Sequence, residues 1–217
     1  ARDVFECRTV AQLVATVEAG GVVTLEEFEG GGSGTVPLTP IAAKMVDRGG
    51  DYNQFVMPMT LSLPEGIDRR QVVETVTAVV DAHDVLRSRL VDTESGPQLD
   101  IAPAGETNVN DWIHRAEFDP AESAGPMSLA EVIKAESGNA LDRLDPRAGA
   151  MIELVWLEPT DPSARGVLVI VPHHLVVDSV SWRILVPDFA IAGAQVAEGT
   201  TPALQPVGTS LRRWTDG

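Results

Sequence analysis

The spacing of hydrophobic and polar residues predicts helices and strands that alternate along most of the chain. Near the N-terminus, Thr9 is placed to cap a helix. Four apolar residues recur at the spacing of one face of that helix: Val10, Leu13, Val14 and Val17. The Gly- and Ser-rich composition that follows predicts a flexible linker over residues 20–35, and therefore a domain boundary.

The pattern after the linker predicts one helix and one strand. Thr39 followed by Pro40 indicates a helix start, and Gly49 indicates its end. Over residues 52–63 the apolar positions alternate, which predicts a half-buried strand. Its apolar positions are Phe55, Met57, Met59, Leu61 and Leu63.

A long helix and a pair of strands are predicted next. Asp68 and Gln71 have the spacing of a capping box. The helix that they open carries one buried face, made of Val72, Val76, Val79, Val80 and His83. Residues 87–91 and 98–101 then predict two short strands around a turn.

The C-terminal half contains the most hydrophobic segments. Residues 102–126 predict irregular structure with one candidate strand near Trp112. Ser128 and Glu131 predict a capping box at the start of another helix. The segments 151–157 and 166–171 predict strands.

The second of these strands is apolar on both faces, which is typical of a central strand covered on both sides. A last long helix is expected to run toward Glu198, kinked or restarted at Pro187. Helices and strands interleave, so the predicted class is α/β, a mixed sheet with helices packed on it.

Composition narrows the classes of partner. The 217 residues carry 32 acidic and 16 basic side chains, a net charge of -16. This balance argues against nucleic acid and anionic membrane surfaces as partners. The single cysteine, Cys7, excludes an internal disulfide, and no apolar run has membrane-spanning length. We therefore expect a cytoplasmic protein and, since no initiator Met is present, a piece of a longer chain.

The candidate chemistry lies in residues 169–182, where an apolar strand stops at Pro172 and two adjacent histidines follow. The unperturbed pKa of histidine, about 6.5, suits proton transfer near neutral pH. In one hypothesis, His174 is an acid or base that Asp178 orients. In a second, His173, His174 and Asp178 bind a metal ion, although no further ligand accompanies them. In a third, both imidazoles are structural and hydrogen-bonded in the core. Because adjacent residues at a strand end point to opposite faces, we expect a split in which one imidazole is buried and structural while the other faces a channel.

Two further residues of this segment invite functional roles. Ser181 lacks the Gly-x-Ser-x-Gly context of a nucleophile and is expected to cap the following helix. Trp182 is expected in the core. The residues alone thus indicate a histidine-based acid/base site with an unknown substrate.

Residues 173–185 resemble the HHxxxDxxSW motif of non-ribosomal peptide synthetase epimerization domains. These domains belong to the condensation-domain superfamily, whose fold is chloramphenicol-acetyltransferase-like. The general condensation pattern is HHxxxDGxS; here Ser179 replaces its glycine, and Trp182 with Arg183 favours the epimerization branch. Four other stretches resemble family segments in the same order: 37–41, 51–55, 81–90 and 207–214.

The resemblance implies a division of the chain into three parts. Residues 1–19 resemble the C-terminal helix of a peptidyl carrier protein, and residues 20–35 the linker after it. Residues 36–217 would form the N-terminal lobe of an epimerization- or condensation-type domain. The second lobe would lie outside this chain.

The resemblance also implies an activity in antibiotic and other secondary metabolism. The domain would interconvert the L and D configurations of an aminoacyl or peptidyl group held as a thioester. That group hangs on the 4′-phosphopantetheine arm of the upstream carrier protein, and no other cofactor is implied. The partners would be the carrier protein, the second lobe and downstream synthetase modules, and this chain alone is expected to be inactive.

In the family pattern, His174 is the channel-facing acid/base, supported by His173, Asp178, Ser181 and Trp182. Asp178 is expected to pair with an arginine, either Arg87 or Arg89. Two alternatives stay open. The first is a condensation domain that forms peptide bonds, and the second is a non-catalytic docking module for carrier or tailoring proteins.

Overall fold

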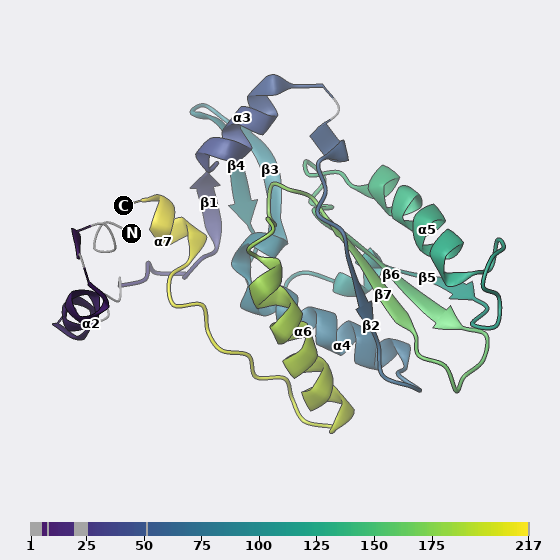
Figure 1. Cartoon of the computed structure of the whole chain (residues 1–217). Helices are drawn as coiled ribbons and strands as arrows, with labels where there is room; N and C mark the ends of the chain where they lie inside the picture. Colours follow the sequence, from purple (N-terminus) through teal and green to yellow (C-terminus); the bar gives the residue numbers. More distant parts are fainter. Residues whose placement is uncertain (1–5, 8, 20–25, 51, 217) are drawn as a thin grey trace.

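The computed structural model describes residues 6–7, 9–19, 26–50 and 52–216. Two β-sheets form the centre of this described part (Figure 1). The first is antiparallel, in the order β1-β4-β3: β1 (Gly34–Pro37), β4 (Gly96–Ile101) and β3 (Ser88–Thr93). The second has the order β2-β7-β6-β5: β2 (Met59–Ser62), β7 (Val167–Pro172), β6 (Ile152–Pro159) and β5 (Ile113–Phe118).

The second sheet is mixed, as predicted. Strands β5 and β6 run parallel, whereas β6, β7 and β2 are successively antiparallel. Helix α4 (Arg69–Ala82) and helix α6 (Trp182–Ala197) pack on one face of this sheet, and α5 (Leu129–Arg143) packs on the other (Figure 1). The remaining helices are α2 (Val10–Ala19), α3 (Pro40–Arg48) and α7 (Leu211–Thr215).

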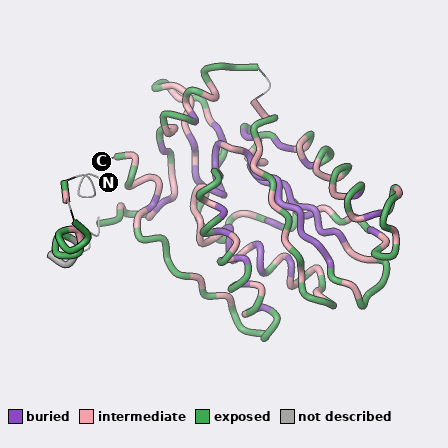
Figure 2. The backbone as a smooth tube through the Cα atoms, viewed as in Figure 1, coloured by how far each residue is buried: buried purple, intermediate pink, exposed green. Residues whose placement is uncertain are grey.

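Strand β7 is the central strand that its composition predicts. All six of its residues are buried, and Figure 2 shows the buried stretches concentrated in the sheet strands. Leu168 and Ile170 join the core with α4 and α6, while Val169 and Val171 join the core under α5. Because strand side chains alternate between faces, a strand covered on both sides must be apolar at every position.

Capping boxes are predicted at the starts of α4 and α5, and only one of them is present. At α4 the predicted capping box is present: Gln71 N–H donates to Asp68 Oδ1 at 2.8 Å, and Asp68 N–H donates to Gln71 Oε1 at 3.1 Å. The box predicted at α5 is wrong. The Ser128 hydroxyl donates instead to the carbonyl of Gly125 at 2.7 Å, which closes the preceding turn.

Two predicted elements have different lengths in the structure. The strand predicted over residues 52–63 is wrong in its first half, where a short 3₁₀ helix (Tyr52–Gln54) precedes β2. Pro58 lacks a backbone donor and lies just before β2, where the alternating pattern would need a ladder bond. The restart of the helix at Pro187 is also wrong, because α6 continues through this residue.

The smaller predictions hold. Gln12 N–H donates to the Thr9 hydroxyl at 3.2 Å, so Thr9 caps α2. Helix α3 begins at Pro40, and Gly49 ends it with a φ of 63°, a conformation that favours glycine. The candidate strand near Trp112 is β5, which follows a 3₁₀ helix (Val109–Trp112).

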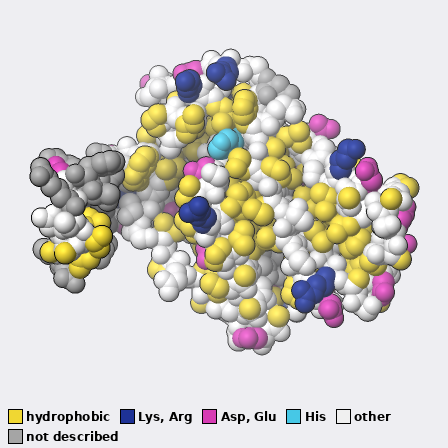
Figure 3. Space-filling view, viewed as in Figure 1, with side chains coloured by type: hydrophobic (Ala, Val, Ile, Leu, Met, Phe, Trp, Pro, Cys, Tyr) yellow, Lys and Arg dark blue, Asp and Glu magenta, His cyan; other side chains and the backbone are white. Residues whose placement is uncertain are grey.

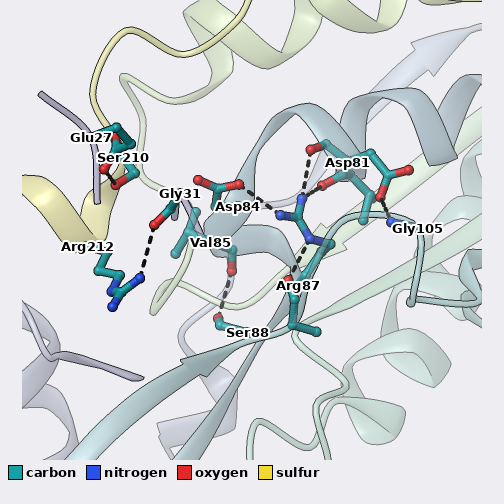
Figure 4. A network of polar contacts seen from close by, with 12 residues as sticks. Glu27, Gly31, Asp81, Asp84, Val85, Arg87, Ser88, Gly105, Ser210 and Arg212 are labelled. Atoms are coloured by element: carbon teal, nitrogen blue, oxygen red, sulfur yellow. Dashed lines mark hydrogen bonds and ion pairs between the residues drawn. The ribbon is translucent and has the colours of Figure 1, made fainter. Parts of the chain in front are cut away.

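The segment that precedes β1 is held against α7. The Glu27 carboxylate accepts hydrogen bonds from the backbone N–H and the hydroxyl of Ser210, at 3.0 and 2.8 Å. Arg212 donates to the carbonyl of Gly31 at 3.3 Å (Figure 4). The predicted linker, residues 20–35, is therefore anchored in its second half, and residues 20–25 lie outside the described part.

Candidate acid/base site

The two histidines lie where β7 ends and the chain turns toward α6. His173 forms an isolated antiparallel bridge with Val56, just beyond the paired part of β7. Val176 N–H then donates to the carbonyl of His173 at 3.1 Å, which closes a tight turn. Adjacent residues of an extended chain point to opposite sides, so the two imidazoles enter different environments.

His173 is completely buried, at 0% relative exposure. Its Nδ1 accepts from Leu175 N–H at 3.0 Å, and its Nε2 lies 3.1 Å from the carbonyl oxygen of Tyr52. A carbonyl only accepts, so Nε2 carries the proton and the ring is the neutral Nε2–H tautomer. The ring also meets the Tyr52 ring edge to face, with centroids 5.9 Å apart. His173 is therefore a structural residue.

Burial makes His173 a pH-sensitive stability element. Desolvation of its ring lowers the pKa to about 4 from 6.5, with a smaller opposing contribution from the Tyr52 carbonyl. Unfolding exposes a ring that takes up a proton below pH 6.5, whereas the folded ring does not until about pH 4. The stabilisation that the neutral His173 ring contributes to the folded state is thus complete above pH 6.5. It falls as the pH drops toward 4.

We expect the free energy of unfolding to fall by about 2–3 kcal/mol between pH 6.5 and 4.5 through this residue alone. Urea titrations followed by circular dichroism at several pH values measure it. His173→Gln, which cannot titrate, is the comparison because all other groups remain. Parallel pH profiles for the two proteins would contradict the assignment.

His174 has a different environment. Its ring Nδ1 lies 2.8 Å from the carbonyl oxygen of Val177 and donates to it. Its backbone N–H donates to the carbonyl of Phe55 at 2.8 Å. The residue is half-buried, and none of the described residues hydrogen bonds to its Nε2. The neutral ring therefore presents a lone pair on Nε2 that can accept a proton. One histidine is buried and the other is half-buried, so the two rings differ in environment as the expected split requires.

Asp178 organises the turn that leads into α6. Its Oδ1 accepts from the Ser181 hydroxyl and N–H, both at 2.7 Å, and from Val180 N–H at 3.0 Å. These bonds favour the charged carboxylate and lower its pKa, with Ser181 as the main cause. The Ser181 hydroxyl is bonded to Asp178, so the prediction that this hydroxyl caps α6 is wrong. Asp178 instead accepts the backbone N–H groups of Val180 and Ser181, which lie just before the helix.

Arg87 belongs to a different network. Its side chain is 1% exposed and forms an ion pair with Asp84 at 2.8 Å. The guanidinium also donates to the carbonyls of Val80 and Asp81, at 2.6 and 2.8 Å (Figure 4). The last carbonyls of α4 have no partner within the helix, and the positive charge of Arg87 satisfies them.

The prediction that Arg87 or Arg89 pairs with Asp178 is therefore wrong for both arginines. Arg87 is committed to the end of α4, and Arg89 on β3 pairs with Asp100 on β4 at 2.8 Å. Within the part of the chain that the structure describes, neither arginine contacts Asp178. The sequence could not exclude these pairs, because both arginines lie in the stretch 81–90 on which the expectation was based.

Trp182 lies in the core, as expected. It is 7% exposed, and its indole N–H donates to the carbonyl of Met57 at 3.0 Å. Three apolar side chains in the turn before Trp182 and along α6 are exposed: Val180 at 60%, Ile184 at 54% and Ile191 at 44%. Figure 3 shows hydrophobic side chains gathered over α6 on this face of the molecule. The histidine turn thus borders an apolar surface.

The geometry and the motif agree with a comparison to known families. Residues 35–215 match the family model described as Condensation domain. The chain belongs to the Condensation domain family. One of the linear gramicidin synthase proteins of Brevibacillus parabrevis is 31% identical over 218 residues, which cover 98% of this chain and 4% of that protein.

Solved structures similar to this Condensation-family chain confirm the fold. The epimerization domain from the third module of tyrocidine synthetase B aligns with a TM-score of 0.70 at 23% identity, over 84% of this chain and 40% of that chain. The X-domain from teicoplanin biosynthesis has a TM-score of 0.65 at 14% identity, over 83% and 37%. The predicted chloramphenicol-acetyltransferase-like lobe is confirmed. The chain spans less than half of either solved domain.

The segment that holds the histidine turn of this Condensation-family lobe is not evident from the sequence pattern. Residues 52–57 contribute the carbonyls of Tyr52, Phe55 and Met57 to His173, His174 and Trp182, as described above. Their apolar alternation suggested an ordinary strand. Pro58 is the signal that could have separated this segment from β2.

The arrangement of the described side chains does not support a metal site at His173, His174 and Asp178. Both ring nitrogens of His173 are occupied by Leu175 and Tyr52. In the described ranges, no cluster of three or more His, Cys, Asp or Glu side chains is arranged to hold a metal ion. No helix in the same ranges is long and apolar enough to span a membrane.

Proposed function

We propose that this chain is part of a non-ribosomal peptide synthetase and contributes His174 as the acid/base of an epimerization reaction. The substrate would be an aminoacyl or peptidyl thioester on the phosphopantetheine arm of a carrier protein. The observation that carries the proposal is the lone pair of His174 Nε2. His174 is half-buried, and the contact of its Nδ1 with the Val177 carbonyl fixes the ring in one tautomer.

The chemistry needs few groups. The α-carbon of a thioester is acidic because the carbonyl delocalises the electron pair left by the proton. His174 Nε2 takes that proton, the pair moves onto the carbonyl oxygen as an enolate, and a proton returned to the opposite face inverts the centre. The group that acts on the opposite face would come from the second lobe, outside this chain.

The surface beside the motif is consistent with such partners. Val180 and Ile184 lie near the C-terminal end of the motif segment and are more than half exposed. Large exposed apolar patches mark interaction sites. We propose that the second lobe covers this face, so that the reacting thioester is shielded from water. His174 is only half-buried, and we propose that the pantetheine arm approaches it from the solvent side.

Condensation is the second candidate, because the matching family model carries that description. In that reaction the same Nε2 would accept a proton from the attacking amine of an acceptor substrate. The complete protein would be given an L-aminoacyl carrier in D₂O, with and without an acceptor. Deuterium at the α-carbon and formation of the D product indicate epimerization. Peptide formation without exchange indicates condensation, and neither product indicates a docking module.

The 217-residue chain by itself is expected to show no α-proton exchange above the buffer rate. Its fold covers 40% of the solved epimerization domain, and half of a channel does not exclude water or orient a thioester. Mass spectrometry of the carrier-bound amino acid in D₂O measures the exchange, with the longer protein as the positive control. Exchange by the short chain would show that His174 acts without a second lobe.

A further inference from the structure

The histidine turn is held from one side by residues 52–57, a segment more than a hundred positions earlier in the chain. Tyr52 accepts the His173 ring N–H, and Phe55 accepts the His174 backbone N–H. Met57 N–H donates to the carbonyl of Pro172 at 3.1 Å. The last residue of β7 and both histidines therefore take their positions from this segment.

The contact with Tyr52 reaches His174 in two short steps. The proton on His173 Nε2 leaves Nδ1 free to accept from Leu175 N–H, which holds the backbone on the far side of His174. The Phe55 carbonyl holds the near side through the His174 N–H. A shift of residues 52–55 would thus move the backbone of His174 and the distance from its Nδ1 to the carbonyl of Val177.

Asn53 anchors this segment to a rigid part of the fold. Its Nδ2 donates to the carbonyl of Leu144 at 3.2 Å, across 91 positions of sequence. Leu144 follows the last turn of α5, and its side chain is 3% exposed. Carbonyls at a helix C-terminus lack partners within the helix, so the Asn53 amide satisfies one that would otherwise stay open.

We propose that Asn53 is a positioning residue for the acid/base histidine. It holds residues 52–57 against the end of α5, and that segment sets the ring orientation and tautomer of His174. The inference deepens the proposed function and rests on it for the catalytic consequence. The structural consequence, the tautomer of His174, can be measured separately.

The test replaces the amide while leaving the rest of the turn intact. Asn53→Asp keeps the volume but removes the N–H donor, and Asn53→Ala removes the side chain. Asn139→Asp and Asn139→Ala are matched controls, because Asn139 lies on the exposed side of α5 and bonds to Glu136 within the same helix. The second Asn53 variant keeps the test decisive if the first does not fold.

Nitrogen-15 NMR of the histidine rings in the full 217-residue chain gives the tautomers directly. We expect His174 to be the Nδ1–H form in the native protein and in the Asn139 variants, and a mixture of tautomers in the Asn53 variants. In the complete protein, the Asn53 variants should lose about tenfold in the rate of α-proton exchange, because small misplacements of a catalytic group are costly. The substrate KM should change little.

Two results overturn the inference. Asn53 variants that are less stable but retain the native tautomers and exchange rate would make Asn53 merely structural. Equal tautomer changes in the Asn139 variants would show a nonspecific effect. If the complete native protein shows no exchange, the proposed function fails, while the tautomer spectra still decide whether Asn53 positions His174.

Discussion

Replacing His174 by Asn in the complete protein is expected to lower the rate of α-proton exchange by about 10²- to 10⁴-fold, the usual contribution of a general base. The Asn side-chain amide reaches only as far as the Nδ1 position and can still donate to the carbonyl of Val177. The variant therefore removes Nε2, the atom with the free lone pair, and preserves the turn. His174→Ala also removes Nε2 and is expected to lower the exchange rate to the same level.

Deuterium wash-in at the α-carbon of a carrier-bound L-aminoacyl thioester measures this effect. His114→Asn is the matched control, because the side chain of His114 on β5 is also partly exposed, at 39%, and pairs with Glu153. The control should exchange at the native rate. A His174→Asn protein that retains exchange would move the base to another residue and refute the proposed role.

Replacing His173 by Leu is expected to cost about 3 kcal/mol of unfolding free energy. Leucine has a similar shape but leaves the Tyr52 carbonyl and the Leu175 N–H without partners at a site with 0% exposure. Each buried polar group that loses its partner costs about 1–3 kcal/mol. For a chain of this length the melting temperature should fall by about 10 °C.

Chemical denaturation at pH 7.5 tests this prediction with two comparisons. His173→Gln can still donate to the Tyr52 carbonyl from its side-chain nitrogen, so it should recover about half of the loss. His114→Leu, which removes a partly exposed ring, should cost far less. A His173→Leu protein as stable as the native one would mean that these two hydrogen bonds contribute nothing net.

The elements that sequence reasoning placed well are those with local causes. The capping box of Asp68 and Gln71 spans four residues, and the double-sided apolar run of β7 is visible in six. Helix periodicity and strand alternation are likewise properties of a short window. The elements placed badly have local signals that other contacts override. Ser128 bonds backward to Gly125, and Pro187 is accommodated within α6.

The candidate site divides in the same way. The pairing of His173 and His174 at a strand end is evident from the motif, and so is the expectation that one is buried. The partners are not evident. Tyr52 lies 121 positions from His173, and Met57 lies 125 positions from Trp182. Among the described residues, the two arginines expected at Asp178 pair with other carboxylates: Arg87 with Asp84 and Arg89 with Asp100.

The order of residues along the chain thus determines the class of fold, the helix and strand positions and the identity of the histidine motif. These depend on spacing of 2 or 3.6 residues and on caps within one turn. The roles within the motif depend on the pairing of β2 with β7, which brings residues 52–57 beside the histidines. That pairing buries one ring, fixes its proton and leaves Nε2 of the other free. Burial and hydrogen-bond partners are properties of the packed chain, so only the three-dimensional arrangement could assign His173 to structure and His174 to chemistry.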